Sequence, residues 1–366
     1  MTPWAHQQAP ELHGEVYAIG FKRYWRPVLR QFLPARAHIH HVAAITDVPM
    51  GAVAVIWGRA VDASQYAEQH NICLFRLEDG FIRSVGLGAQ FVKPLSWVID
   101  RQGMYFDATQ ASDLETLLND ATFCDAELAE AEALITQLNQ LKISKYNTGA
   151  TEWQPRVGKP KQPVILVTGQ VESDASIQFG AVANGIRKNI DLLKAVRVAH
   201  PDAYLVYKPH PDVLAKARQA GDSEALAHDY CDEVVGDVSL THMLDEVDEV
   251  HVLTSLSGFE ALLRGKKVSC YGLPFYAGWG LTHDHAQCAR RQRARTLTEL
   301  VAGALIRYPV YIHPHSNECI TAAAAVNVLQ QQRLQQQQSS QWQRLRHNMS
   351  HMLRASIRRI LNRVRP

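Results

Sequence analysis

The sequence lacks any long hydrophobic run. Among its 366 residues, no segment approaches the roughly 18 consecutive apolar residues that a transmembrane helix requires. The amino terminus, MTPWAHQQAP, also lacks the basic start and following apolar stretch of a secretory signal. These absences predict a protein that works in the cytoplasm and is attached peripherally to the inner face of the cytoplasmic membrane.

Cysteine is also scarce, and no two cysteines form a CxxC pair. Six are scattered without a histidine at zinc-binding spacing: Cys73, Cys124, Cys231, Cys270, Cys288 and Cys319. The pattern predicts reduced thiols rather than a disulfide framework. Neither sign of charge is in large excess, because 38 Lys and Arg oppose 36 Asp and Glu, for a net charge of +2. This balance argues against a general nucleic-acid binder.

The composition is that of a folded protein with about two domains. Hydrophobic residues make up 46% of the chain and charged residues 20%. The length, divided by roughly 150 residues per domain, gives about two domains. The stretch KYNTGATEWQPRVGKPKQP has no apolar period and is rich in Gly, Pro and Lys. We therefore expect one domain over residues 1–150 and a second over 151–328.

Short β-like segments alternate with helical ones on both sides of this boundary. The first half has expected strands in EVYAIG, GAVAVIWG, ICLFRLEDG and SWVIDR, and helices in RYWRPVLRQFL, ASDLETLLNDA and residues 125–141. The second half has expected strands in VILVTG, AYLVYK, EVHVLT and KVSCYG, separated by helices. The alternation predicts parallel sheets with crossover helices. Two Rossmann-like α/β domains of this kind bind ligands in the cleft between them, beyond the carboxyl ends of the strands.

Polar side chains gather at three predicted strand ends of the second domain. The loops are VTGQVESDASI, YKPHPD and LTSLSGFEALL. Together these loops suggest a phosphate site made of hydroxyls and amides from one loop and of Lys208 and His210 from another. The polar candidates are Gln170, Glu172, Asp174, Ser176, Lys208, His210, Thr254, Ser255 and Ser257. Cations, hydroxyls and the free N–H groups of a following helix all favour an anion. Taken singly, Ser-x-Ser-Gly is more often a helix N-cap and His-Pro more often a structural turn.

The first domain offers a comparable strand end in LEDGFIRSVGLG. Glu78 and Asp79 are candidates for a general base or for hydroxyl binding, and Arg83 or the glycines for an anionic group. An Asp-Gly pair after a strand is also typical of a plain turn. The GLG triplet lacks the strand–GxGxxG–helix context of a dinucleotide site, and we reject NAD binding.

Five longer stretches combine into a specific pattern: EDGFIRSVGLG, PLSWVIDRQGMYFDAT, LVTGQVESDASI, YKPHPDV and TSLSGFEALLRGKKVSCYGLPFYAGWGLT. The pattern resembles the capsule polysaccharide biosynthesis family typified by KpsC, over one complete module from about Val16 to about Pro314. The resemblance implies a GT-B-like α/β glycosyltransferase, with two Rossmann-like domains facing a central cleft. Its implied activity is retaining transfer of β-Kdo (3-deoxy-D-manno-oct-2-ulosonic acid) from CMP-β-Kdo.

The resemblance also implies roles for the candidate residues. Retention by double displacement requires a carboxylate at the anomeric carbon, which implies Asp174 as nucleophile, with Glu172 ranked second. Lys208 and His210 would bind the CMP phosphate and stabilise it as it leaves. The other donor-binding candidates are Gln170, Ser176, Thr254, Ser255, Ser257, Gly258 and Glu260, and the acceptor-binding candidates are Glu78, Asp79 and Arg83.

Several alternatives stay open. Asp174 has the sequence position of a helix N-cap before ASI, and Glu260 that of a first-turn carboxylate complementing the helix dipole. The loop GLPFYAGWG, residues 272–280, either closes over the donor or packs its Phe275 and Trp279 into the core. At the level of function, the alternatives are an inverting, sialyltransferase-like CMP-sugar transferase and a non-catalytic capsule assembly or export component.

The segment THDHAQC places His283, Asp284 and His285 together, which invites a metal ion. Adjacent residues on an irregular loop rarely supply a whole coordination sphere. We therefore assign no metal, and no cofactor beyond the CMP-β-Kdo donor substrate.

The carboxyl terminus has a composition of its own. Residues 329–343, LQQQRLQQQQSSQWQ, predict a flexible Gln-rich linker. Over residues 344–366, apolar side chains recur at helical spacing while arginines fill the other face, which predicts a basic amphipathic helix. This helix would lie on anionic lipid, with each Arg contributing on the order of 1 kcal/mol, or pack on protein. The expected partners are a CMP-sugar donor, a glycolipid or oligosaccharide acceptor and the inner membrane surface, without nucleic acid.

Overall fold

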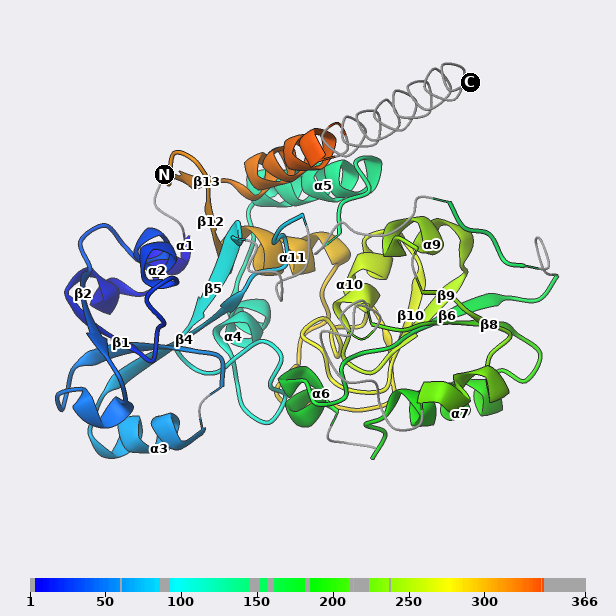
Figure 1. The fold of residues 1–366 in the computed structure, drawn as a ribbon, viewed down its shortest axis with the longest axis horizontal. Helices are drawn as coiled ribbons and strands as arrows, with labels where there is room; N and C mark the ends of the chain where they lie inside the picture. Colours follow the sequence, from blue (N-terminus) through cyan, green and yellow to red (C-terminus); the bar gives the residue numbers. More distant parts are fainter. Residues whose placement is uncertain are drawn as a thin grey trace, which may run out of the picture.

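The computed structural model describes residues 4–59, 61–85, 93–144, 152–156, 161–181, 185–210, 213, 224–236, 238–336 and 338. Most of the predicted boundary segment over 145–163, the GLG triplet, the end of the Gln-rich stretch and the predicted basic helix over 344–366 lie outside these residues. The described chain forms two β-sheets with helices around them, which confirms the predicted α/β class (Figure 1). No helix in the described part of the chain has the length and apolar character needed to cross a bilayer.

The first half is built on a seven-stranded sheet with the order β13-β12-β5-β4-β3-β1-β2. Its strands are β1 (Glu15–Ile19), β2 (His38–Val42), β3 (Val53–Trp57), β4 (Cys73–Asp79), β5 (Ser96–Asp100), β12 (Pro309–Ile312) and β13 (Cys319–Ile320). Strands β1 to β4 run parallel, as the sequence predicts.

Strand β5 runs antiparallel to β4, so the prediction of a parallel sheet is wrong at this strand. A parallel pair needs a crossover connection, usually a helix. The chain instead turns straight back after β4, because the Gly80 N–H donates to the Ser96 carbonyl at 3.0 Å and the Leu95 N–H donates to the Arg83 carbonyl at 2.8 Å.

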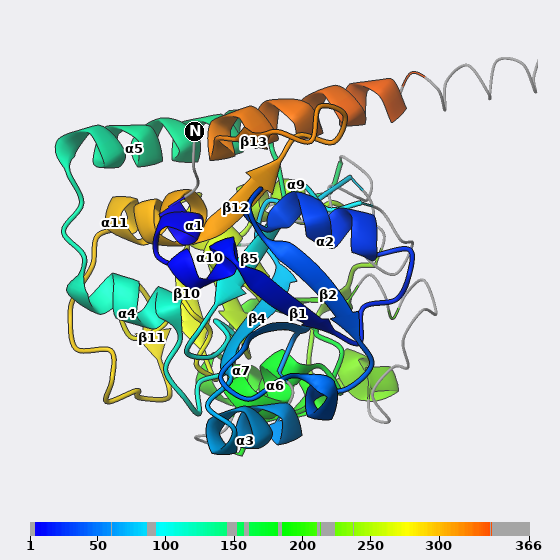
Figure 2. The same ribbon diagram turned by 90° about the vertical axis from the view of Figure 1, so that its left-hand side faces the viewer.

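Helices cover both faces of the first sheet (Figure 2). The helical segments of this half are α1 (Trp4–Gln7), η1 (Pro10–His13), α2 (Arg26–Phe32), η2 (Ile45–Asp47), α3 (Val61–Gln69), α4 (Asp113–Asp120) and α5 (Asp125–Gln140). On one face, Trp97 of β5 is 1% exposed and stacks on Phe32 of α2 with ring centroids 4.5 Å apart. On the other, Ala63 and Ala67 of α3 pack against Leu74 of β4. Because successive side chains of each strand point to opposite faces of the sheet, there is one hydrophobic core on each face.

The second half is built on a six-stranded sheet with the order β11-β10-β9-β6-β7-β8. Its strands are β6 (Val164–Thr168), β7 (Tyr204–Lys208), β8 (Glu233–Val234), β9 (Glu249–Val252), β10 (Lys267–Cys270) and β11 (His283–Asp284). All neighbouring pairs are parallel. Numbered along the chain from β6, the order is the 3-2-1-4-5-6 arrangement of dinucleotide-binding folds, which confirms the predicted Rossmann-like sheet. The strand order reverses between β6 and β9.

The helices of the second half connect these strands and continue beyond them. They are α6 (Ala175–Gly180), α7 (Asn189–Ala199), η4 (Glu224–Asp229), α9 (Leu240–Glu246), α10 (Leu256–Leu262), α11 (Leu297–Val301) and the π-helix η5 (Ala302–Arg307). The buried residues Ile190, Leu193 and Val196 of α7 lie against one face of the sheet, and Phe259 and Leu262 of α10 belong to the core on the other.

The chain returns to the first half after the second sheet is complete. Strand β12 pairs with β5 and β13 pairs with β12, although both strands lie within the 151–328 range that we assigned to the second domain. A helix over 322–336 then lies alongside α5 (Figures 1 and 2). Residues 329–336 of the Gln-rich stretch are thus helical rather than a flexible linker, because Leu329 is fully buried and Arg333 donates to the Leu141 carbonyl at 2.8 Å.

The two halves share one hydrophobic core. Phe81, just after β4, stacks on Phe275 of the second half with ring centroids 4.4 Å apart, and Phe259 of α10 lies beside Phe275 at 5.1 Å. Polar contacts reinforce this packing, since the buried Glu115 carboxylate of α4 pairs with Arg290 at 2.6 Å and Arg291 at 3.0 Å. The carboxyl-edge loops of the two sheets are therefore held in a defined relation.

The start of α5 is fixed by an ion pair that gives a testable pH dependence. Arg307 donates from Nε and Nη2 to the two carboxylate oxygens of Glu127, each at 2.7 Å, and these bonds lower the pKa of Glu127 to about 2. The stabilisation is present above the ordinary pKa of about 4.5 and is lost as the pH falls toward 2. We expect Glu127→Gln to lower the free energy of unfolding by about 1 kcal/mol at pH 7, since the pair is partly exposed.

Urea unfolding at pH 7 and at pH 3 measures this effect. The difference between Glu127→Gln and the wild type should shrink at the lower pH, because the carboxylate of the unfolded chain takes up a proton there while the folded one, with a pKa of about 2, largely keeps its charge. The exposed Glu130 of the same helix supplies the control, and Glu130→Gln should match the wild type. Equal stability of Glu127→Gln and the wild type at pH 7 would contradict the assignment.

Candidate functional site

Two neighbouring loops at the carboxyl edge of the second sheet are joined by a side-chain amide. Gln170, after β6, accepts a hydrogen bond from the Thr254 N–H at 2.8 Å and donates to the Thr254 hydroxyl at 3.0 Å. Both side chains belong to buried residues. The contact lies where the strand order reverses, the point at which ligands bind in open α/β sheets. Gln170 is therefore a structural clamp at the expected site, and its amide is already engaged by protein groups.

A chain of hydroxyls lies beside this clamp. Thr168 and Ser257 are 2.6 Å apart through their Oγ atoms, and the Ser257 hydroxyl donates to that of Ser255 at 2.7 Å. Ser255 caps α10 by accepting from the Ser257 N–H at 3.2 Å. The Tyr276 hydroxyl donates to the Ser255 carbonyl, and burial raises the pKa of Tyr276 well above its ordinary range, so it remains a donor. The N-cap interpretation of this segment is confirmed, and its hydroxyls form one connected set.

Two glycines allow these loops to pack closely. A Cβ added at Gly258 would overlap the Tyr276 hydroxyl, and one added at Gly169 would overlap the Tyr207 hydroxyl. Tyrosines thus occupy the space beside both glycines. Gly258 therefore has a packing role, in addition to the donor-binding role that the resemblance implies.

Asp174 lies at the amino-terminal end of α6, on the loop that follows β6. Its Oδ1 accepts from the Ser176 N–H at 3.0 Å, which is the N-cap geometry left open by the sequence. The residue is exposed, and no other hydrogen bond to its carboxylate is found within the described residues. The cap therefore fixes one oxygen of Asp174 and leaves the second facing solvent.

Glu172 and Asn189 secure the other side of the same loop. The Glu172 carboxylate accepts from the Asn189 N–H at 2.9 Å, at the start of α7. The Asn189 side chain accepts from the Gln170 N–H and donates to the Gln170 carbonyl, both at 2.9 Å. The sequence analysis did not identify Asn189, because an asparagine beginning a helix carries no sign of a partner 19 residues earlier. The Glu172 carboxylate therefore makes a structural hydrogen bond to the start of α7.

Lys208 is the last residue of β7, which neighbours β6 in the sheet, and His210 lies two residues beyond it. Lys208 pairs with Thr168 across the two parallel strands, so their side chains share one face of the sheet. The Lys208 ammonium is buried and donates to the carbonyls of Gly236 at 2.9 Å and Val238 at 2.6 Å. His210 is half-buried, and its carbonyl accepts from the Val213 N–H at 3.0 Å. The structure thus holds a cation on the Thr168 face of the sheet.

The acceptor candidates of the first half form a separate cluster. Arg83 donates from Nε to Asp79 at 2.6 Å and from Nη1 to the Ser84 hydroxyl at 2.8 Å, and is only 3% exposed. Glu78 is half-buried and accepts from the Asp79 N–H at 3.0 Å. Phe81, within the same motif, connects this cluster to the second half through its stacking on Phe275.

The aromatic loop over 272–280 is packed into the core. Phe275, Tyr276 and Trp279 are 6%, 0% and 1% exposed, which supports the packing alternative over a loop that closes on a ligand. Glu260, on α10, is also buried at 7% exposure. In the 171–176 loop, by contrast, Ser173 and Asp174 are exposed.

The carboxyl edge of the first sheet meets this region at α6. The Arg59 guanidinium, two residues after β3, lies over the Phe179 ring of α6, 3.8 Å from its centroid. The Ala108 N–H donates to the Phe179 carbonyl at 3.1 Å. Loops of the first half therefore contact the helix that Asp174 begins.

The sequence motifs and this geometry have counterparts in known proteins. Residues 55–312 match the model of the family described as capsule polysaccharide biosynthesis protein. This chain belongs to the capsule polysaccharide biosynthesis family. The resemblance inferred from the sequence is thereby confirmed, and the matched range contains both carboxyl-edge clusters described above.

The curated relatives named below are longer than this chain. Capsule polysaccharide modification protein LipA of Neisseria meningitidis serogroup B is 44% identical over 338 residues, which cover 90% of this chain and 47% of LipA. Lipopolysaccharide-processing protein LpsZ of Rhizobium meliloti is 43% identical over 261 residues, or 70% of this chain and 59% of LpsZ. The chain spans about half the length of the curated relatives it matches.

Two solved structures match nearly end to end. The chain described as Thermosulfurimonas dismutans KpsC, beta Kdo 2,7 transferase, is 36% identical with a TM-score of 0.73, and the match covers 87% of this chain and 99% of that one. The chain described as the KpsC beta Kdo 2,4 transferase of the same organism is 31% identical with a TM-score of 0.77, and the match covers 89% and 100%.

Proposed function

We propose that this chain is a retaining glycosyltransferase that transfers β-Kdo from CMP-β-Kdo to a glycolipid or saccharide acceptor of a surface polysaccharide. The observation that carries the proposal is the near-complete coverage of two KpsC chains described as β-Kdo transferases, at 36% and 31% identity. The Rossmann order of the second sheet supports it, since nucleotide ligands bind where such an order reverses.

The proposal assigns the CMP-sugar to the second half and the acceptor to the first, as in a GT-B transferase. The buried cation of Lys208 and the hydroxyls around Ser255 suit a phosphate. The contacts of Arg59 and Ala108 with α6 support an acceptor reaching Asp174 from the first half. The basic segment over 344–366 is proposed to hold the enzyme at the inner membrane surface, where a glycolipid acceptor would lie.

The proposed chemistry is a double displacement. The free carboxylate oxygen of Asp174 attacks the anomeric carbon of Kdo, the bond from that carbon to the phosphate oxygen breaks, and CMP leaves with the bonding electrons. Lys208 and His210 stabilise the phosphate as its charge grows. An acceptor hydroxyl then attacks the same carbon, its proton passes to Glu78 or Asp79, and Asp174 is released as a carboxylate.

Intact-mass spectrometry without an acceptor tests this function. We expect the purified protein, incubated with CMP-Kdo generated in place, to gain the mass of one Kdo residue on the peptide that contains Asp174. The reason is that the first step needs only the donor, while the second needs an acceptor hydroxyl.

Each other outcome selects against a part of the proposal. Transfer to an acceptor without any adduct would overturn the covalent mechanism and favour inversion. The absence of both an adduct and a thermal shift on adding CMP would overturn the donor assignment, and would favour a non-catalytic role in capsule assembly or export.

A further inference from the structure

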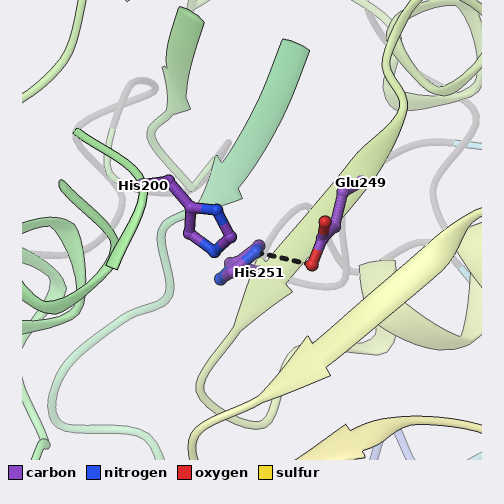
Figure 3. Close-up of side chains that lie close together, drawn as sticks. All are labelled: His200, Glu249 and His251. Carbon is purple, nitrogen blue, oxygen red and sulfur yellow. Dashed lines mark hydrogen bonds and ion pairs between the residues drawn. The ribbon is translucent and has the colours of Figure 1, made fainter. Parts of the chain in front are cut away.

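Two histidines and a glutamate meet at the end of the second sheet opposite to the candidate donor site (Figure 3). His200 directly follows α7, whereas Glu249 and His251 lie on β9, whose first residue is Glu249. One potential ligand atom from each of the three residues lies within 4.8 Å of the other two. The Gln170 clamp engages Thr254, beyond the other end of this strand. The cluster is thus distinct from the site described above.

His251 has an unused nitrogen in the interior. The residue is 1% exposed, and its Nε2 lies 2.9 Å from Oε1 of Glu249, which also accepts from the Ser269 hydroxyl at 3.0 Å. Its Nδ1 is buried and has no hydrogen-bond partner among the described residues. A buried polar atom without a partner costs free energy. The hydrogen bond with Glu249 therefore satisfies Nε2 of the His251 ring and leaves Nδ1 without a partner among the described residues.

His200 presents a second imidazole to the same position. Its ring lies edge-on to that of His251, with centroids 5.1 Å apart and planes at 87°, and Figure 3 shows the two rings next to one another. Within the described residues, the His200 side chain makes no hydrogen bond.

We propose that His200, Glu249 and His251 bind a divalent transition-metal ion of the Zn²⁺ class. Two imidazole nitrogens and a carboxylate oxygen are a common ligand set for such ions, with water completing the coordination. Metal–ligand bonds of about 2.0–2.2 Å would draw together three atoms that already lie within 4.8 Å of one another. The ion would tether the end of α7 to strand β9.

We assigned no metal from the sequence, where His283, Asp284 and His285 stood out because they are adjacent. The three proposed ligands come from a helix end and a strand, and only the fold brings them together. His283, on β11, pairs with Ser269 of β10, is exposed and lies outside the group of three. It therefore provides a matched control histidine.

Zinc binding by the full chain tests the proposal. The protein is prepared without a histidine tag, stripped with a chelator and titrated with ZnCl₂, and bound metal is counted by mass spectrometry after dialysis. We expect one Zn²⁺ per chain and an increase in the melting temperature. His200→Gln and Glu249→Gln should each lower the affinity by about tenfold or more, a loss typical of removing or altering a ligand or its support. His283→Gln should leave the affinity unchanged.

Three results would overturn the proposal. The first is the absence of Zn²⁺, Co²⁺ and Ni²⁺ binding to the wild type, with no change in melting temperature. The second is undiminished binding by His200→Gln, which would assign the metal to other groups such as the cysteine thiols. The third is an equal loss in His283→Gln. The readouts are independent of Kdo transfer, so the failure of either proposal leaves the other standing.

Discussion

Replacing Asp174 with alanine is expected to lower the rate of Kdo transfer by about a thousandfold or more, since nucleophile removal typically has effects of this size. CMP binding should persist, because no hydrogen bond of the Gln170–Thr254 clamp or of the Thr168–Ser257 hydroxyl pair involves Asp174. The measurements are single-turnover transfer and the thermal shift on adding CMP. The covalent adduct should also disappear.

The N-cap role of Asp174 requires a second variant. Alanine removes both the carboxylate and the cap of α6, and loss of a cap costs about 1 kcal/mol of stability. Asparagine caps helices as well as aspartate does, so Asp174→Asn should keep the stability and still lose the adduct. An active Asp174→Asn beside an inactive Asp174→Ala would show that the residue acts only as a cap. Ser173→Ala, at the exposed neighbour, should retain activity.

Replacing Gln170 with alanine is expected to weaken CMP binding by about tenfold or more. The change leaves the Thr254 N–H without its acceptor at a buried position, which costs about 1–3 kcal/mol. The cost destabilises the loop conformation that binds CMP. About 1.4 kcal/mol of such destabilisation lowers the affinity tenfold. Isothermal titration of CMP measures the affinity.

A control on α6 separates this effect from general loosening of the loop. Gln178 is exposed and its side chain donates to the Ser173 carbonyl at 3.2 Å, away from the Gln170–Thr254 contact, so Gln178→Ala should bind CMP as the wild type does. If Gln170→Ala lowered the melting temperature without changing CMP affinity, the clamp would be a fold contact and not part of the donor site.

The strands of the second sheet were predictable because each is a short, nearly continuous apolar run. VILVT and YLVYK are buried along their whole length, as central parallel strands must be. The two-residue strands β8 and β11 carry no such pattern. The orientation of β5 was also beyond the sequence, since it depends on hydrogen bonds made by Gly80 and Leu95.

The candidate site was predictable as a set of loops but not as a set of contacts. Gln170, Thr254 and Ser257 were identified because they follow strands whose carboxyl ends share one edge. The hydrogen bonds between the Gln170 amide and Thr254 could not be predicted, because the two residues are 84 positions apart in the chain. Asn189 and Tyr276 were missed for the same reason, because their partners are set by the fold rather than by neighbours in sequence.

The return of β12 and β13 to the first sheet makes the second half an insertion within the first. During synthesis, β5 emerges long before its partner β12, and it remains an open sheet edge until residues 309–320 leave the ribosome. The inserted half has all its strands by residue 284 and can therefore complete its sheet first. The first sheet can therefore be completed only after the whole second sheet has been translated.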